Sequence, residues 1–450
     1  MGAAQSVLEL YGPLINARLQ QGRDPAWLRQ WRAAAQQRLE QSGLPGKHRE
    51  SWHYSAADLW LQQFSERHSL APSLPVADDV SVAADLPDGH LLRFVQGYLA
   101  DQQVRHEQHD ETFGEERDKF SLQALAQLDP SQSAELLAWL AASEQTDPLA
   151  DLITTLTPET WLLTVKAGAQ VENPIVISHL ASQQGCHIGQ LLVWLQPGAS
   201  ATLVEDFSAT PAAGEYLALA HTAFKLEQGS RLTYARSNRD GADGLHLGVT
   251  AADLGRDAQL RLQALESGMG AQLRNRVRNG FHARLTQTGA EFIARGAFAA
   301  DNRQHIDYHF TVEHYGDYGR SDIQMQGLAG AKSRGIVNGR IYIAQDTRGN
   351  DGHFTSHNLL LSADAEIDAK PELEIYADEV KCAHGATVGQ LDADQLLYLQ
   401  TRGIDREEAI ALLTEGFLKA GLLDSGNDEL NQYFQQRLLT GLKKSGGIEA

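Results

Sequence analysis

The feature that most constrains the fold of this chain is a long central region in which apolar and polar residues alternate in short runs. The alternation starts near Trp161, and the runs end at glycines or at turn pairs such as Pro197-Gly198 and Asp240-Gly241. A period of two is typical of a strand with one buried face, and many short runs with regular turn residues indicate an all-β region. We therefore expect a β domain over residues 156–390. Because no fixed-length repeat is legible, the pattern alone leaves a sandwich, a barrel and a β-helix open.

Both ends of the sequence indicate helices instead. Asp24-Pro25 has the pattern of a helix N-cap followed by the first helical residue. After residue 390, Asp392 and Asp405 each stand three residues before a glutamine or glutamate, which is the spacing of a capping box. These signals predict a mainly β protein with helical ends: an N-terminal helical and mixed region over residues 1–155, and a C-terminal helical domain over residues 391–450.

The composition limits the partners of the chain. Its 58 acidic and 38 basic residues give a formal net charge of -20, which disfavours nucleic acid or an anionic membrane as a partner. No apolar run approaches the length of a membrane-spanning helix, and no phosphate-binding loop pattern is present. The only two cysteines, Cys186 and Cys382, lie far apart, as is typical of a reducing compartment. We expect a cytoplasmic protein that binds no nucleotide itself.

The strongest chemical signal is Cys382 with His384 two residues later. The preceding residues alternate with the period of a strand, from Leu373 through Ile375. If the strand continues, Cys382 and His384 share a face and are separated by roughly 6.5 Å along it. Thiolate and imidazole are both good ligands for iron. The alternative is structural: a cysteine that packs as a small apolar residue, with His384 at the end of the strand.

Several motifs in this part of the chain occur in a fixed order. They are Asn358-Leu-Leu-Leu-Ser362, Pro371-Glu-Leu-Glu-Ile375, Cys382-Ala-His-Gly-Ala-Thr-Val388, Leu397-Tyr-Leu399 and Arg402-Gly-Ile404. Together they resemble the closing signature of the SufB/SufD family, the scaffold proteins of iron-sulfur cluster assembly. The resemblance is dense over about residues 330–420 and looser at Glu50-Ser-Trp-His-Tyr54 and Asn173-Pro-Ile-Val176. The sequence His384-Gly-Ala-Thr387 and the scarcity of cysteine resemble SufD more than SufB.

The resemblance implies a β-helix core and a role without enzymatic turnover. It implies a complex with a SufB-type subunit and a SufC-type ABC ATPase, on which iron or a nascent iron-sulfur cluster is held transiently. Cys382 and His384 would then lie at the SufB interface and share metal ligation with that subunit. The helices after residue 391 would dock the ATPase through Leu397, Tyr398, Arg402, Ile410, Leu413 and Phe417. A flavin in the assembled complex and a homodimer of the isolated chain stay open.

Two alternative functions stay open, one within the resembled family and one in another class of protein, besides a purely structural interaction protein in which Cys382 and His384 are inert. One is a SufB-type subunit that nucleates the cluster itself, although two cysteines are few for that role. The other is a β-helix enzyme acting on carbohydrate, which would need paired acids in a groove, and Asp364, Glu366 and Asp368 alternate along one run.

A further polar run could be mistaken for a metal site. His305, Asp307, His309 and Glu313 also share one strand face, which we interpret as a solvated outer face.

Overall fold

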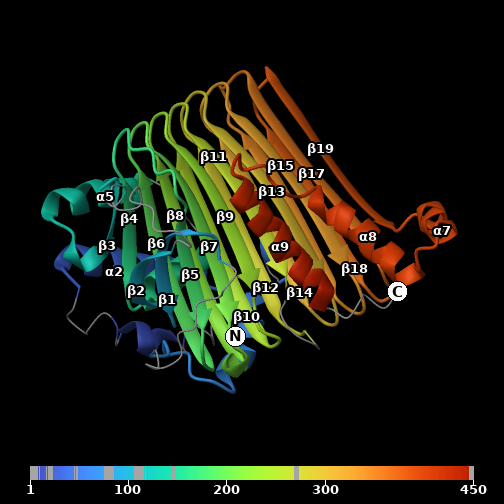
Figure 1. Ribbon diagram of the computed structural model, residues 1–450. Coiled ribbons are helices and arrows are strands. Elements are labelled where there is room, and N and C mark those ends of the chain that lie inside the picture. Colours follow the sequence, from blue (N-terminus) through green and yellow to red (C-terminus); the bar gives the residue numbers. More distant parts are fainter. Residues whose placement is uncertain are drawn as a thin grey trace.

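The computed structural model describes residues 24–44, 49–74, 86–105, 118–142, 147–267 and 273–444, together with residues 9, 11–16, 18, 46 and 116. Its core is a β-solenoid, in which the strands of the coiling chain alternate between two sheets (Figure 1). Sheet A has the order β18-β16-β14-β12-β10-β8-β6-β4-β3, and sheet B has the order β19-β17-β15-β13-β11-β9-β7-β5-β1-β2. The mainly β fold with helical ends is confirmed, and its core is the β-helix that the family resemblance implies.

The nineteen strands that the structure describes have the following bounds. They are β1 (Gly89–Val95), β2 (Tyr98–Arg105), β3 (Phe120–Ala124), β4 (Thr160–Val165), β5 (Ile175–Ala181), β6 (Gly185–Leu195), β7 (Ser200–Ala209), β8 (Tyr216–Leu226), β9 (Arg231–Arg239), β10 (Gly244–Leu254), β11 (Gln259–Ser267), β12 (Arg276–Leu285), β13 (Glu291–Ala300), β14 (His305–His314), β15 (Arg320–Ala329), β16 (Arg334–Ile343), β17 (Asn350–Leu360), β18 (Glu366–Ile375) and β19 (Val380–Gln390).

The register of the strands explains why no repeat is legible in the sequence. Ser200, Arg231, Gln259 and Glu291 lie opposite one another on successive strands of sheet B, so consecutive coils contain 31, 28 and 32 residues. The turns between strands absorb these differences while the ladders stay in register. A fixed spacing is therefore absent although the structural repeat is regular.

The space between the sheets is filled by the inward side chains of every coil. In the later coils, Phe281, Tyr308 and Phe310 stack with nearly parallel rings. Phe354 is fully buried in the same core. A side chain at Gly339 would collide with its ring, so the glycine leaves the space that Phe354 occupies. Each fully buried aromatic side chain of this kind contributes roughly 1.5–3 kcal/mol.

The two ends of the solenoid differ. At the first end, β2 runs antiparallel to β1, and β3 runs antiparallel to β4, so each sheet finishes in a reversed strand. At the other end, β18 and β19 are the outermost strands of the two sheets, and each pairs on one side only within the described ranges. We call this second end the open end.

Helices of the N-terminal region cover the outer face of sheet A. These are α2 (Ala26–Ser42), α3 (Ala57–Ser65), α5 (Pro130–Ala142) and α6 (Pro148–Leu156). Leu61 and Phe64 of α3 pack into the same buried cluster as Leu217 and Leu247 of sheet A. Within the described part of the chain, no helix is long and apolar enough to cross a membrane.

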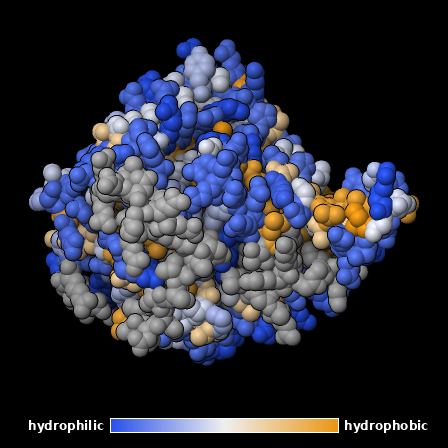
Figure 2. All heavy atoms as spheres, in the orientation of Figure 1, coloured by the Kyte–Doolittle hydropathy of each residue, from blue (hydrophilic) through white to orange (hydrophobic). Residues whose placement is uncertain are grey.

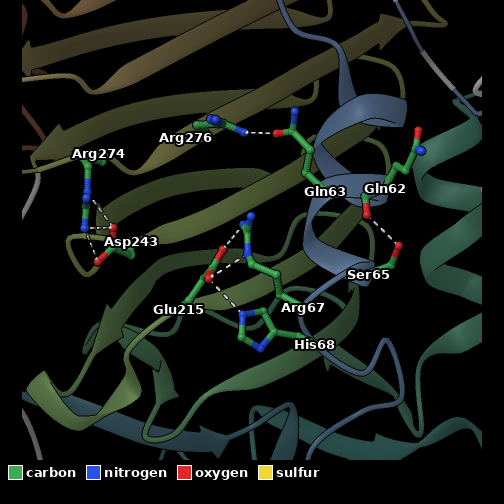
Figure 3. Close-up of polar contacts among 9 residues, drawn as sticks. All are labelled: Gln62, Gln63, Ser65, Arg67, His68, Glu215, Asp243, Arg274 and Arg276. Carbon is green, nitrogen blue, oxygen red and sulfur yellow. Dashed lines mark hydrogen bonds and ion pairs between the residues drawn. The ribbon is translucent and has the colours of Figure 1, made fainter.

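Polar contacts fix α3 and the residues after it on the sheet (Figure 3). The guanidinium of Arg276 donates to the side-chain oxygen of Gln63 over 3.1 Å. Glu215, just before β8, pairs with Arg67 and lies 2.9 Å from Nε2 of His68. The helix is therefore tied to two separate coils.

Residues 49–55 form a strap across the outer face of sheet A. The guanidinium of Arg278 lies 3.7 Å from the ring centre of Trp52, and it donates to the carbonyl oxygen of Ser51 over 2.9 Å. Farther along, Glu50 pairs with Lys370 on β18 at 2.5 Å. The strap thus connects the N-terminal region to the coils next to the open end.

The strap also overturns the interpretation of His305, Asp307, His309 and Glu313 as one solvated face. Asp307 is 0% exposed and His309 only 7%, because Ser55 and Trp52 lie over this part of the sheet. Burial alone would raise the pKa of Asp307. However, His309 and Arg278 beside it lower that pKa below its usual range. The centre of the run is thus a buried ion-pair cluster.

The C-terminal helices are α7 (Ala393–Thr401), α8 (Arg406–Lys419) and α9 (Asp428–Lys444). Asp392 and Asp405 cap α7 and α8 through backbone N–H groups, as the sequence predicts. Helices α8 and α9 lie along the outer face of sheet B (Figure 1). Asp206 of that sheet accepts from Tyr433 on α9 at 3.2 Å and pairs with Arg437 at the same distance. By contrast, α7 buries no residue.

Candidate functional site

Cys382 and His384 both lie on β19, the outermost strand of sheet B at the open end. Cys382 is in register with Gly352 of β17, and His384 with Phe354. Phe354 points into the solenoid core, and residues in register on neighbouring strands point to the same side. Cys382 and His384 therefore face the interior of the solenoid, in its last coil.

The thiol of Cys382 is half-buried and packs against the edge of the core. Burial raises its pKa, and the nearby carboxylate of Asp351 raises it further, while the backbone N–H of Gly352 acts in the opposite direction. The neutral thiol is therefore favoured in the isolated chain. A thiolate would need a cation or a metal ion close by.

The imidazole of His384 is exposed, in contrast to the half-buried thiol. Among the described residues, no group of three or more His, Cys, Asp or Glu side chains is arranged to hold a metal ion. Cys382 and His384 can therefore supply at most part of a coordination shell, and further ligands would have to come from another molecule.

The rim around the pair is apolar. Ile375 at the end of β18 is 38% exposed, Tyr376 after it is 61% exposed, and Val388 on β19 is 46% exposed. The period-two pattern of the sequence marks Ile375 as an ordinary core position and places Tyr376 on the opposite face, so it singled out neither residue. Ile375 and Val388 are exposed because no further coil covers them in the described part of the chain, whereas Tyr376 lies beside Tyr342 with ring centres 5.6 Å apart.

The six residues expected to dock an ATPase fall into two groups. Leu397 and Tyr398 on α7 are 59% and 57% exposed, and Arg402 stacks on Tyr398 with its guanidinium 5.2 Å from the ring centre. Figure 2 shows a hydrophobic patch on the projection that Figure 1 labels α7. On α8, by contrast, Ile410 is 5% exposed. Leu413 and Phe417 are half-buried on the same helix.

The acids that suggested a carbohydrate-active enzyme are paired with cations on the neighbouring coil. Arg334 forms ion pairs with both Glu366 and Asp368, and Lys332 lies 3.6 Å from Asp364. These carboxylates lie along the outer face and the edge of sheet A. Each already has a partner, so the pattern does not form a pair of free catalytic acids.

Fold and site together define a β-solenoid protein in which a cysteine and a histidine lie on the outermost described strand of one sheet. Residues 1–177 match the description "SufBD protein N-terminal region", and residues 178–417 match "SUF system FeS cluster assembly, SufBD core domain". The chain belongs to the SufBD family of iron-sulfur cluster assembly proteins.

Three relatives illustrate the range of similarity. A SufBD family iron-sulfur cluster assembly protein of Synechocystis is 26% identical over 389 residues, which cover 83% of this chain and 82% of that protein. The iron-sulfur cluster assembly protein SufD of Escherichia coli is 42% identical over 118 residues, 26% of this chain and 28% of that protein. The chloroplastic protein ABCI7 of Arabidopsis thaliana is 26% identical over 274 residues, 58% of this chain and 56% of that protein.

Proposed function

We propose that the chain is a non-catalytic, SufD-like scaffold subunit in the cytoplasm, which pairs with a SufB-type subunit at its open end. The observation that carries this proposal is the position of Cys382 and His384 on β19, which pairs on one side only in the part of the chain that the structure describes. An unpaired edge presents backbone donors and acceptors that another strand can satisfy. The exposed apolar side chains of Ile375 and Val388 would be buried by the same contact.

In this arrangement iron or a nascent cluster is cargo, held between the two subunits. His384 would donate a ring nitrogen from its exposed position. Cys382 would donate sulfur after losing its proton, because a metal ion close by stabilises the thiolate against the burial that disfavours it. The partner would supply the remaining ligands. In the absence of a partner, a second copy of the chain would occupy the same edges and form a homodimer.

A SufC-type ATPase would dock on α7 and the adjoining surface of α8. Leu397, Tyr398 and Leu412 offer exposed apolar surface there, and Arg402 adds a charged group. Phe417 would act indirectly, since it packs against the buried cluster between the C-terminal helices and sheet B, and Ile410 is buried. The nucleotide, and a flavin if the complex carries one, would be bound outside this chain.

The test is the cluster yield of the reconstituted complex with His384→Ala or Cys382→Ala. Lys381→Ala is the matched control, because Lys381 is exposed on the opposite face of the same strand. We expect His384→Ala to reduce cluster yield with normal subunit assembly, and Lys381→Ala to change neither quantity. Normal cluster yield in a normally assembled complex that carries both substitutions at once would refute the ligand role.

A further inference from the structure

The strap, residues 49–55, is attached to four neighbouring strands of sheet A. Its contacts lie on β12, β14, β16 and β18, and they are made by an aromatic ring, a hydroxyl, a second aromatic ring and a carboxylate. In strand order they are Trp52 with Arg278, Ser55 with Asp307, Tyr54 with Arg334, and Glu50 with Lys370. The strap therefore joins consecutive coils of the solenoid, up to the outermost strand of sheet A.

A half-buried imidazole lies directly under the strap. Nε2 of His305 is 2.8 Å from Oγ of Ser55, and the ring of Trp60 on α3 packs edge-on against it with ring centres 4.9 Å apart. The hydroxyl proton of Ser55 goes to the carboxylate of Asp307, so His305 donates to Oγ from Nε2. The second oxygen of Asp307 is 3.0 Å from Nε2 of His309. The strap and α3 thus cover His305 with two uncharged side chains.

The charges that face His305 come from sheet A and are mainly positive. Arg276 and Arg278 approach from β12, and Arg334 approaches from β16. Burial lowers the pKa of His305 to about 4, from 6.5; the carboxylate of Asp307 opposes this shift, and the three guanidiniums add to it. Under the closed strap the imidazole is therefore held neutral.

We propose that the strap is an acid-sensitive latch, with His305 as the sensor beneath it. While the strap is closed, the imidazole is shielded from water among three guanidiniums, which disfavours a further positive charge. Release of the strap exposes the ring to water, which solvates the imidazolium. Acid therefore favours the open strap, while Asp307 stays ionised because its own pKa is lowered below the usual range. Opening uncovers the outer face of sheet A and releases β18 from the N-terminal region.

The pH range of the latch follows from the two states of the imidazole. With the strap closed the pKa of His305 is about 4, and with the strap open it approaches the usual 6.5. Above pH 6.5 the ring is neutral in both states, so pH does not affect the strap. As the pH falls from 6.5 towards 4, only the open state takes up the proton and is favoured. Trp60 and the arginines stay in place, so we expect about a tenfold increase in opening between pH 7.5 and pH 5.

The test is amide hydrogen exchange of the full chain at pH 7.5 and pH 5, expressed as protection relative to an unstructured peptide at the same pH. The amides to follow are those of Trp52, His53 and Ser55, which donate to carbonyl groups within the strap. In the wild-type chain their protection should fall about tenfold at pH 5. In His305→Gln, whose amide keeps a donor for Ser55 but does not titrate, protection should fall twofold at most. Equal protection at both pH values in the wild-type chain, or a tenfold fall in His305→Gln, would overturn the latch.

Two further variants separate the sensor from its surroundings. His53→Gln is the matched control, because His53 belongs to the strap but is exposed, and this variant should keep the tenfold fall. Loss of that fall would assign the response to His53 and overturn the role of His305. Ser55→Ala removes the hydroxyl that joins the strap to His305 and Asp307, so it should lower protection several-fold already at pH 7.5. Unchanged protection in Ser55→Ala would show that this contact does not hold the strap, and would also overturn the latch.

Discussion

The two ends of the solenoid differ in the direction of their outermost strands. At the first end the chain reverses direction, and β2 and β3 close the two sheets as antiparallel strands. At the open end β18 and β19 continue the parallel pattern and then stop. Natural sheets usually block their edges, because a free edge recruits other strands. This difference is the basis of our proposal that the open end receives a partner.

Side-chain chemistry follows the same division. At the first end, which we call the closed end, the buried carboxylate of Glu116 accepts hydrogen bonds from the backbone N–H groups of Glu172 and Asn173. At the open end, the described residues leave His384 exposed and the rim apolar. Polar groups that already have hydrogen-bond partners stabilise the fold, whereas an exposed side chain such as His384 is available to another molecule.

The largest expected effect concerns the strap, which supports the coils near the open end. Trp52→Ala removes a nearly buried ring that stacks on Arg278, and it should lower the free energy of unfolding by about 3 kcal/mol. Native-state hydrogen exchange should show the loss of protection mainly in β10, β12 and β14, where Trp52 and its partner Arg278 pack, and less in β5 and β7. A uniform loss over both ends would show that the strap does not act on the open end in particular.

The next largest expected effect is on partner binding, and it compares a substitution on β19 at the open end with one on β2 at the closed end. Val388→Asp places a charge in the apolar rim, and it should weaken binding of a SufB-type partner about 100-fold, or ~2.7 kcal/mol. Ala100→Asp is the matched control, because Ala100 is exposed on β2, the outermost strand at the closed end. It should leave binding unchanged, as measured by titration calorimetry. Equal losses in both variants would contradict the assignment of the interface to the open end.

A smaller effect is the acid sensitivity of the closed end. Burial tends to raise the pKa of Glu116, but hydrogen bonds from His90, Glu172 and Asn173 lower it to about 2, from 4.5. Because the folded-state pKa is the lower one, the stabilisation is complete above about pH 4.5 and is lost as the pH falls towards 2.

Glu116→Gln should therefore cost on the order of 1–2 kcal/mol at pH 7 and much less at pH 3, as measured by urea unfolding. Hydrogen exchange should place the loss in β1 and β5, beside Glu116, and not at the open end. An equal loss of unfolding free energy at both pH values would mean that the charge of Glu116 does not stabilise the fold.

Local features of the fold could be predicted from the sequence because they depend on near neighbours. The alternation located the strands, and the acids at Asp392 and Asp405 located two helix caps. Even so, the N-cap expected at Asp24 is wrong by one residue, since α2 begins at Ala26 with Pro25 as its cap. Asp24 pairs with Arg32 and Arg18 instead.

Long-range features could not be predicted in this way. The spacing of Cys382 and His384 placed them on one strand, but nothing local shows that this strand is the last of its sheet. The burial of Asp307 depends on Ser55, which lies some 250 residues earlier in the chain. Similarly, the sequence does not show whether Ile410, Leu413 and Phe417 of α8 face a partner or the solenoid, and Ile410 proves to be buried.

The most direct test of the central claim is amide hydrogen exchange of the chain, measured with and without a SufB-type partner. If the open end is the interface, the amides of β18 and β19 should gain protection in the complex, while those of β2 should not change. Gained protection along β2, with β18 and β19 exchanging as in the free chain, would contradict the account.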